Sequence, residues 1–260
     1  MSNIQRAIEK KVAEGHKALI PFITAGDPNI EATEQFIYAL ERAGSTVIEI
    51  GIPFSDPVAD GPVIQRANLR AMANEIDINK VFKMVEQVRK HTDIPIVYLM
   101  YANTVFHYGI QNFFEKCKEV GVDGVIIPDV PLEEKEEFNG FARENDVDFI
   151  SLVAPTSKDR TKEICEDASG FIYCVSSLGV TGTRASFHTN LNEMFSEINK
   201  YTKVPTALGF GVSNKEQAAE LKKYADGIIV GSAMVKIIEA FGEKAESRLY
   251  DFAKQMVEVL

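Results

Sequence analysis

Two carboxylates near the end of one apolar segment are the residues best suited to chemistry. Glu49 lies within the apolar run TVIEI, and Asp60 follows in the loop before a helical run from about Val63 to Ala73. A carboxylate buried among apolar neighbours must be paired, neutral or functional, because burying an uncompensated charge is costly. Glu49 therefore has two interpretations, a structural ion pair or a general acid/base whose pKa is raised by burial.

The aspartates of the following loop have plainer alternatives. Asp60 could cap the helix that follows it, and a functional role depends on its closeness to Glu49. Asp56, within Ser55-Asp56-Pro57, is a common turn residue, so we expect a turn or partner-contact role for it. Pro53 and Pro57 restrict the conformational freedom of this loop and lower the entropy cost of presenting the two aspartates.

Two glycine-rich turns follow the last two apolar runs of the chain. They are Gly209-Phe210-Gly211 and Gly231-Ser232. Glycine lets the backbone approach an anion closely, and the N-terminus of a following helix directs free N–H groups toward it. These turns predict a phosphate site, with plain turn glycines as the alternative. The long loop from Ser176 to Arg184 could be a lid or an idle loop, and Thr181 and Gly182 are its candidate ligand contacts.

Other kinds of catalytic site find little support in the sequence. The four histidines are scattered without metal-binding spacing, and no lysine follows a strand in a setting suited to Schiff-base chemistry. Three widely spaced cysteines indicate reduced, structural thiols rather than a metal or disulfide framework. The reaction we infer is acid–base chemistry by two carboxylates on a phosphorylated small molecule, with no metal.

Composition limits the partners and the location of the chain. The net charge of −10 argues against nucleic acid and requires an anionic substrate to be held by local donors. The charged N-terminus does not resemble a signal peptide, and no apolar run is long enough to span a membrane. We therefore expect a soluble cytoplasmic protein.

Short apolar runs alternate with amphipathic segments along the whole chain. The runs are nearly continuous in hydrophobicity, which is typical of parallel strands buried on both faces. We predict eight strands: 18–23, 46–50, 94–100, 124–127, 148–153, 170–175, 204–208 and 227–230. Helical patterns fit 31–43, 63–73, 79–90, 111–120, 132–145, 158–167, 191–199, 214–224 and 233–241, with extra helices at 3–13 and 246–260.

This alternation predicts an α/β fold, a (β/α)8 TIM barrel forming a single domain over residues 1–260, with extra N-terminal and C-terminal helices. A doubly wound open sheet is the competing architecture, but it would need fewer strands and an early GxGxxG. In a barrel, catalytic groups lie at the carboxyl ends of the strands, which is where Glu49 and Asp60 fall.

The chain resembles the tryptophan synthase α subunit family over essentially its full length. The most specific segment is IEIGIPFSDPVADGP, residues 48–62. The supporting stretches are PFITAGDP (21–28), LMYAN (99–103), PDVP (128–131), GVTG (179–182) and GFGV (209–212).

The resemblance implies retro-aldol cleavage of indole-3-glycerol phosphate to indole and glyceraldehyde 3-phosphate. Glu49 would be the general acid/base, and Asp60 would hold the indole N–H and stabilise the developing positive charge. The phosphate would bind near Gly182, Gly211, Gly231 and Ser232, and the indole would be walled by Phe22, Leu99, Tyr173 and Phe210.

The resemblance also implies a β subunit that takes up the indole in an α2β2 complex. Pyridoxal phosphate would belong to that partner, and this chain would need no cofactor. The candidate partner contacts are Pro53, Asp56, Asn103, Phe106, Asp129 and Pro131. Two rival functions are a barrel glycosidase and a catalytically silent regulator. A glycosidase also uses two carboxylates, but its sugar sites favour stacking aromatic residues, and this chain has no Trp.

Overall fold

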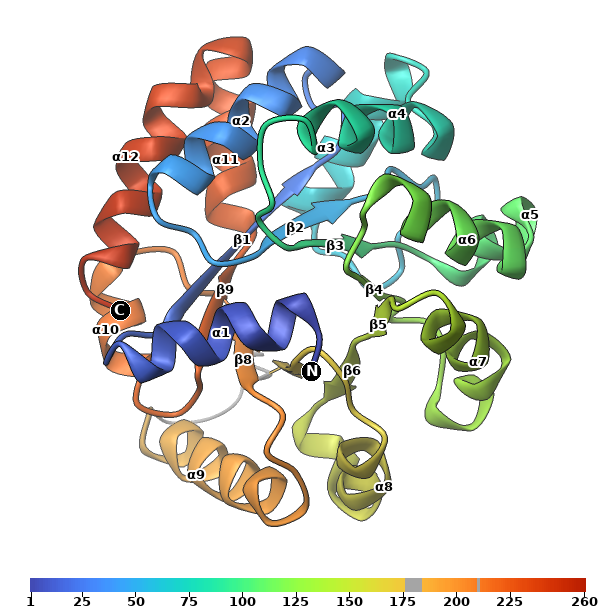
Figure 1. The fold of residues 1–260 in the computed structure, drawn as a ribbon. Coiled ribbons are helices and arrows are strands. Elements are labelled where there is room, and N and C mark those ends of the chain that lie inside the picture. The colour runs from blue at the N-terminus through green and yellow to red at the C-terminus, as the bar shows by residue number, and fades with distance from the viewer. Residues whose placement is uncertain (176–183, 210) are drawn as a thin grey trace.

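The apolar runs form parallel strands that pair in the order β5-β4-β3-β2-β1-β9-β8-β7-β6 (Figure 1). The structure is a computed structural model, and it describes residues 1–175, 184–209 and 211–260. Within these residues the strands are β1 Ala18–Thr24, β2 Ile48–Gly51, β3 Ile96–Leu99, β4 Gly124–Ile126, β5 Asp148–Phe149, β6 Ser151–Val153, β7 Ile172–Val175, β8 Thr206–Gly209 and β9 Gly227–Val230.

The sheet closes on itself because β5 and β6 are two parts of one strand. Only Ile150 separates them, and its backbone N–H still donates to the carbonyl of Val125 at 2.9 Å. Counted as one, β5 and β6 reduce the nine strand segments of the described residues to eight. The predicted eight-stranded parallel barrel is therefore confirmed, and the alternative of an open, doubly wound sheet is wrong.

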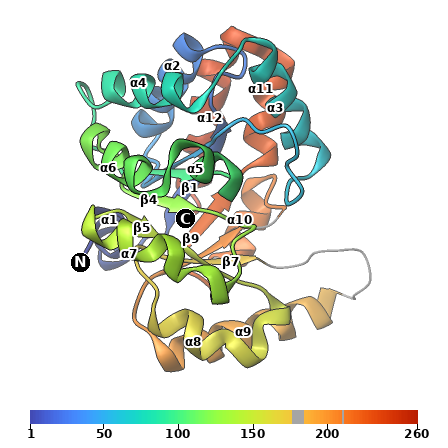
Figure 2. The same cartoon turned by 90° about the vertical axis from the view of Figure 1, so that its right-hand side faces the viewer.

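Helices surround the barrel on its outer side (Figure 2). In the described part of the chain the α-helices are α1 Asn3–Ala13, α2 Ile30–Arg42, α3 Pro62–Ala73, α4 Ile78–Val88, α5 Ala102–Tyr108, α6 Ile110–Val120, α7 Glu136–Glu144, α8 Thr161–Glu166, α9 Arg184–Tyr201, α10 Lys215–Leu221, α11 Ser232–Phe241 and α12 Glu246–Val257. Short 3-10 turns occur at η1 Leu132–Glu134, η2 Pro155–Arg160 and η3 Gly242–Ala245.

Two helices differ from the sequence prediction by more than a few residues at their ends. α9 begins at Arg184 rather than Leu191, and α5 was not predicted at all. The first backbone N–H of α5, at Ala102, donates to the Asp129 carboxylate at 3.0 Å, so its N-terminus is satisfied by a residue of the loop after β4. A helix capped by a distant loop carries no capping signal in its own sequence.

The apolar side chains form two layers, one inside the barrel and one between the strands and the helices. The outer layer packs helix residues such as Phe36 and Phe82 against outward-facing strand residues such as Ile50. The inner layer fills the barrel with Ala18, Ile20, Val47, Val97, Ile126, Ile150, Phe171, Ala207 and Ile229. This alternation of inward and outward residues along each strand follows from the two-residue period of a β-strand.

Helix α1 closes one end of the barrel. Its Ile4 and Ile8 are fully buried and belong to the inner apolar layer. Figure 1 shows α1 lying across the barrel, and Figure 2 shows the β2–α3 connection on the side away from α1. The end closed by α1 is the amino-terminal end of the strands, so the carboxyl-terminal end is the one available for a site.

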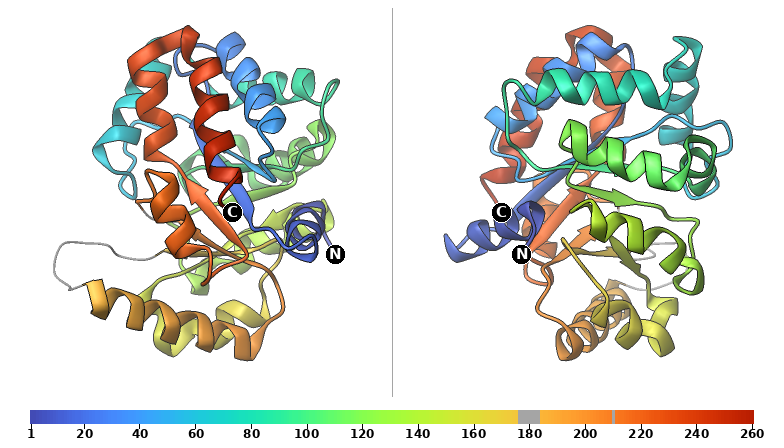
Figure 3. Two further views of the ribbon diagram at one scale, coloured as in Figure 1. Left: turned by 90° about the vertical axis from the view of Figure 1, so that its left-hand side faces the viewer. Right: turned by 45° about the vertical axis from the view of Figure 1, so that its right-hand side comes forward.

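The C-terminal helices complete the outer layer. α12 runs between α11 and α2 (Figure 3), and Val257 of α12 packs against Gly44 at the end of α2. Arg42 and Glu246 form an ion pair at 2.7 Å across this contact. None of the helices in the described residues is both long enough and apolar enough to cross a membrane.

Candidate active site

Four of the predicted site residues lie inside the barrel near the carboxyl-terminal ends of its strands. Each of these four residues follows, by two positions, a residue of the inner apolar layer. The pairs are Val47 and Glu49, Ile20 and Phe22, Val97 and Leu99, and Phe171 and Tyr173. A spacing of two places both residues of each pair on the same face of the strand. The four side chains therefore face the barrel interior near the carboxyl ends of β1, β2, β3 and β7.

Glu49 is the buried acid of this group. It is 1 % exposed, and its Oε2 atom has no hydrogen-bond partner among the described residues. Burial in apolar surroundings, together with the neighbouring charge of Asp60, raises the pKa of Glu49 to about 8. A carboxyl group with such a pKa can both donate and accept a proton near neutral pH, which is the property of a general acid/base.

Asp60 lies beside Glu49 but in more polar surroundings. Burial raises the pKa of Asp60, while hydrogen bonds from the side chains of Tyr101 and Asn68 act in the opposite direction. Asp60 is not the cap of α3, because the N-cap position is Gly61 and no side chain caps this helix. The capping alternative for Asp60 is therefore wrong.

Two glycines make room for the aromatic walls. A Cβ atom on Gly51 would lie 2.5 Å from the Phe22 ring, and one on Gly209 would lie 2.4 Å from the Tyr173 ring. Both distances are far below van der Waals contact, so these rings can occupy the barrel mouth only because residues 51 and 209 lack side chains. Burial raises the pKa of Tyr173, and the charges of Glu49 and Asp60 add to this shift, which places the Tyr173 hydroxyl near both acids.

The predicted phosphate-binding turns lie at neighbouring strand ends. Gly231 is the N-cap of α11 and Ser232 is its first residue, so the unpaired N–H groups of the first helical turn lie at the end of β9. A Cβ on Gly231 would lie 3.6 Å from Phe22, which places this helix end beside the aromatic wall. Gly211 has a φ of +62°, a conformation that favours glycine.

The remaining predicted residues fall into two groups. Thr181, Gly182 and Phe210 lie outside the described residues. The predicted partner contacts lie in the connections after β2, β3 and β4, with Asn103 and Phe106 on α5, at the same end of the barrel as the acids. Asp56, Asn103, Phe106, Asp129 and Pro131 are exposed there, and Pro53 is half-buried.

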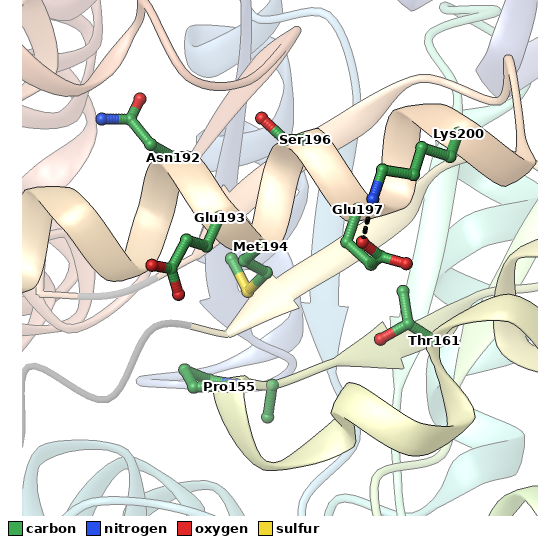
Figure 4. Close-up of a pocket in the computed structure, with 9 residues that line it drawn as sticks. Pro155, Thr161, Asn192, Glu193, Met194, Ser196, Glu197 and Lys200 are labelled. Atoms are coloured by element: carbon green, nitrogen blue, oxygen red, sulfur yellow. Dashed lines mark hydrogen bonds and ion pairs between the residues drawn. The ribbon is translucent and has the colours of Figure 1, made fainter.

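A separate hollow of about 670 Å³ lies between α9 and the η2–α8 segment (Figure 4). Its lining includes Pro155 and Met194 but neither of the two acids. Glu197 and Lys200, one turn apart on α9 at the edge of this hollow, form an ion pair at 2.5 Å. The hydrogen bond from Lys200 lowers the pKa of the Glu197 carboxyl, which is the opposite of what burial does to Glu49 in the barrel mouth.

Sequence reasoning missed the residues that surround Asp60. Asn68, on α3, is 3 % exposed, and Tyr101, at the N-cap of α5, is 2 % exposed. Asn68 lies eight positions after Asp60, and its sequence surroundings give no indication of a functional role. Tyr101 lies within the stretch LMYAN that supports the family resemblance, and this was the one available indication.

Comparisons with known proteins identify the family of the chain. The family described as "Tryptophan synthase alpha chain" matches residues 8–259. A tryptophan synthase alpha chain of Thermoanaerobacter sp. (strain X514) is 48% identical, with all of both chains aligned. Another, from Alkaliphilus metalliredigens, is 46% identical over 99% of this chain and 98% of its own length.

Solved structures give the same result. The tryptophan synthase subunit alpha of Legionella pneumophila str. Paris superposes with a TM-score of 0.91 at 36% identity, covering 100% of this chain and 98% of the other. A chain of the tryptophan synthase a2b2 complex of Pyrococcus furiosus superposes with a TM-score of 0.86 at 37% identity, covering 94% and 99%. The chain described here belongs to the tryptophan synthase alpha chain family.

Proposed function

We propose that Glu49 and Asp60 perform, in this chain, the lyase reaction of its family. That reaction cleaves indole-3-glycerol phosphate to indole and glyceraldehyde 3-phosphate and passes the indole to a β subunit. The observation that carries the residue assignment is the pairing of a buried acid, whose pKa is raised to about 8, with a second acid in more polar surroundings. Two carboxylates with different protonation states can divide the roles of proton transfer and charge stabilisation.

Glu49 acts as the proton carrier in this proposal. Protonation of indole C3 weakens the bond between C3 and the glycerol carbon, and loss of the proton from the adjacent hydroxyl then releases the aldehyde. The C3–C bonding electrons return to the indole ring, so one proton is delivered and one is removed. A single carboxyl group with a pKa near 8 can do both in sequence, because neither of its protonation states is strongly disfavoured.

Asp60 supplies the electrostatic part of the reaction. Protonation at C3 places positive charge on the indole nitrogen, and a fixed carboxylate that accepts the indole N–H stabilises this charge. The hydrogen bonds from Tyr101 and Asn68 favour the ionised form of Asp60. Because Asp60 is already oriented before the charge develops, little reorganisation is needed during the reaction.

The indole ring and the phosphate of the substrate would bind to residues of the neighbouring strands and their loops. Phe22, Leu99 and Tyr173 are positioned to wall a flat aromatic ring next to Glu49, with Phe210 predicted to join them. The N-terminus of α11 at Gly231 and Ser232 offers N–H groups for the phosphate, with Gly211 and the predicted Gly182 and Thr181 completing its site. Because the chain carries a net charge of −10, phosphate binding depends on such local donors.

We further propose that the loops after β2, β3 and β4 form the surface for the β subunit. These strands are neighbours in the barrel, so their loops form one continuous surface beside Glu49. The Pyrococcus furiosus relative was solved as an a2b2 complex, which supports the same assembly here. Pyridoxal phosphate would then be bound by the partner, since the two carboxylates of this chain supply the proton and the charge that the lyase step needs.

The assignment of Asp60 is tested by Asp60→Asn, measured as indole released from indole-3-glycerol phosphate. Asparagine keeps the size of the side chain but removes the negative charge, so we expect kcat/KM to fall by about 100-fold or more. Asp56→Asn removes an equivalent charge from the same loop at an exposed position and serves as the matched control, with activity retained in the absence of partner. An Asp60→Asn rate equal to wild type would remove Asp60 from the mechanism. Hydrolysis of aryl glycosides by the wild-type chain would favour the glycosidase alternative instead.

A further inference from the structure

Tyr101 connects three points of the loop that carries Asp60. Its ring stacks on Phe54, with centroids 5.1 Å apart and planes inclined by 22°. Its hydroxyl oxygen accepts the backbone N–H of Ala59 at 3.0 Å. The Asp60 carboxyl lies close to the same hydroxyl, so that burial and the Asp60 charge raise the pKa of Tyr101, while the hydroxyl opposes the rise in the pKa of Asp60. One side chain therefore contacts the start of the loop, the residue before Asp60 and Asp60 itself.

The hydroxyl can serve both polar partners at once. A tyrosine hydroxyl has one proton to donate and lone pairs to accept with. Because the Ala59 N–H occupies a lone pair, the hydroxyl proton is directed to the carboxylate of Asp60. The backbone hydrogen bond from Ala59 also makes the hydroxyl a better donor, since hydrogen bonds in a chain polarise one another.

Tyr101 is itself held firmly by the barrel. It is 2 % exposed and directly follows Met100, whose N–H donates to the carbonyl of Ile126 at 3.0 Å. On its other side, the N–H of Ala102 donates to the carboxylate of Asp129. The hydroxyl therefore projects from a rigid part of the fold toward a loop that has no strand or helix pairing of its own.

We propose that Tyr101 is a positioning residue for the lyase reaction, which holds the carboxylate of Asp60 toward the indole nitrogen through its hydroxyl. This inference rests on the proposed role of Asp60. In this role Tyr101 acts through Asp60 and not on the substrate, and Asn68 on α3 acts on the same carboxylate from the other side. The Asp60 loop is thus oriented from two sides, by the connection after β3 and by α3.

The test is a double-mutant cycle with Tyr101→Phe and Asp60→Asn, measured as kcat and KM for indole-3-glycerol phosphate cleavage. Tyr101→Phe keeps the ring stacked on Phe54 and removes only the hydroxyl. We expect kcat/KM to fall by about 10- to 100-fold in the Asp60 background, which is the range for losing a hydrogen bond to a charged group. In the Asp60→Asn background we expect less than a twofold further change, because no carboxylate remains to be held.

The pH profile provides a readout that a purely structural role would not change. Loss of the donor raises the pKa of Asp60, so the acidic limb of kcat/KM, which rises as Asp60 ionises, should move to higher pH in Tyr101→Phe. The other titratable groups that face this site are Glu49 from β2, Tyr173 from β7 and Asp129 beside Tyr101. None of them is substituted, so the limb near pH 8 that belongs to Glu49 should stay in place.

Tyr98→Phe is the matched control. Tyr98 lies on β3 shortly before Tyr101, is fully buried, and its hydroxyl has no hydrogen-bond partner among the described residues. We expect Tyr98→Phe to change kcat/KM by less than twofold in both backgrounds.

Three results would overturn the inference. They are an unchanged rate in Tyr101→Phe, an equal loss in both backgrounds, or an acidic limb that does not move. Failure of the proposed function would look different, because Asp60→Asn alone would then keep full activity and leave Tyr101 nothing to position.

Discussion

At the scale of single residues, Glu49 and Asp60 carry the same functional group in different surroundings. Glu49 is enclosed by apolar side chains on a strand, and nothing in the described residues bonds its Oε2 atom. Asp60 lies on a loop, where Tyr101 and Asn68 donate hydrogen bonds to it. The surroundings therefore differ in the way that the proposed roles of proton carrier and fixed charge require, a difference that the residue types alone do not give.

The burial of Glu49 predicts a dependence of stability on pH. Its pKa is about 8 in the folded chain and 4.5 as the ordinary value, so between these pH values the folded state holds a proton that the unfolded state has lost. The free energy of unfolding should therefore fall as pH rises from about 5 to 8, by at most about 1.4 kcal/mol per pH unit from this group.

Urea unfolding of wild type and Glu49→Gln at pH 5.5 and 8.5 measures this contribution. Glutamine cannot titrate, so the variant should gain stability relative to wild type as pH rises. A difference between the two proteins that is the same at both pH values would mean that Glu49 is not held protonated by the fold.

Gly209 tests the packing of the aromatic wall. In Gly209→Ala the new methyl group would meet the Tyr173 ring and displace it, and we expect kcat/KM for indole release to fall by about 10- to 100-fold. Gly140→Ala on α7 is the matched control, because its Cβ meets nothing within 4 Å. The control should keep full activity and gain up to about 1 kcal/mol of stability from better helix propensity. Full activity in Gly209→Ala would show that the ring position is not needed.

At the scale of elements, the two ends of the barrel have separate tasks. α1 closes the amino-terminal end with Ile4 and Ile8, and the loops at the carboxyl-terminal end present the acids and the glycine turns. Between these ends the barrel interior is filled by packed apolar side chains. Changes at the α1 end should therefore affect stability and leave the chemistry intact.

Ile8→Ala tests this separation. Truncating a fully buried isoleucine should lower the free energy of unfolding by about 2–5 kcal/mol, while kcat/KM of the folded protein stays within about twofold of wild type. Val12→Ala, a substitution at a position of the same helix that is 37% exposed, should change stability by about 0.5 kcal/mol or less. A large loss of kcat/KM in Ile8→Ala, at a temperature where the variant is folded, would contradict the separation.

At the scale of the whole molecule, the sequence predicted the barrel because its strands are buried on both faces. Such strands give uninterrupted apolar runs, and all eight runs correspond to strands or, at 148–153, to the pair β5 and β6. The acids Glu49 and Asp60 were identified for a related reason, since a carboxylate inside or just after an apolar strand is conspicuous. That residues 1–260 form a single domain stays a prediction.

Features that depend on distant contacts could not be predicted. The N-terminus of α5 is capped by Asp129, which lies on another loop. Gly51 and Gly209 are required only because the rings of Phe22 and Tyr173 pack against them. Tyr101 likewise binds the backbone of Ala59, more than forty positions earlier in the chain. Local sequence patterns report burial well, but they do not report which side chains meet across the barrel mouth.

The central claim, that Glu49 carries the proton, is tested most directly by indole release from indole-3-glycerol phosphate in Glu49→Gln. Glutamine has nearly the same size and can neither donate nor accept the proton, so we expect no indole above background, both alone and with a saturating β subunit. Circular dichroism and binding to the β subunit, both unchanged from wild type, would show that the variant is folded. Indole release by this folded variant at the wild-type rate would contradict the claim.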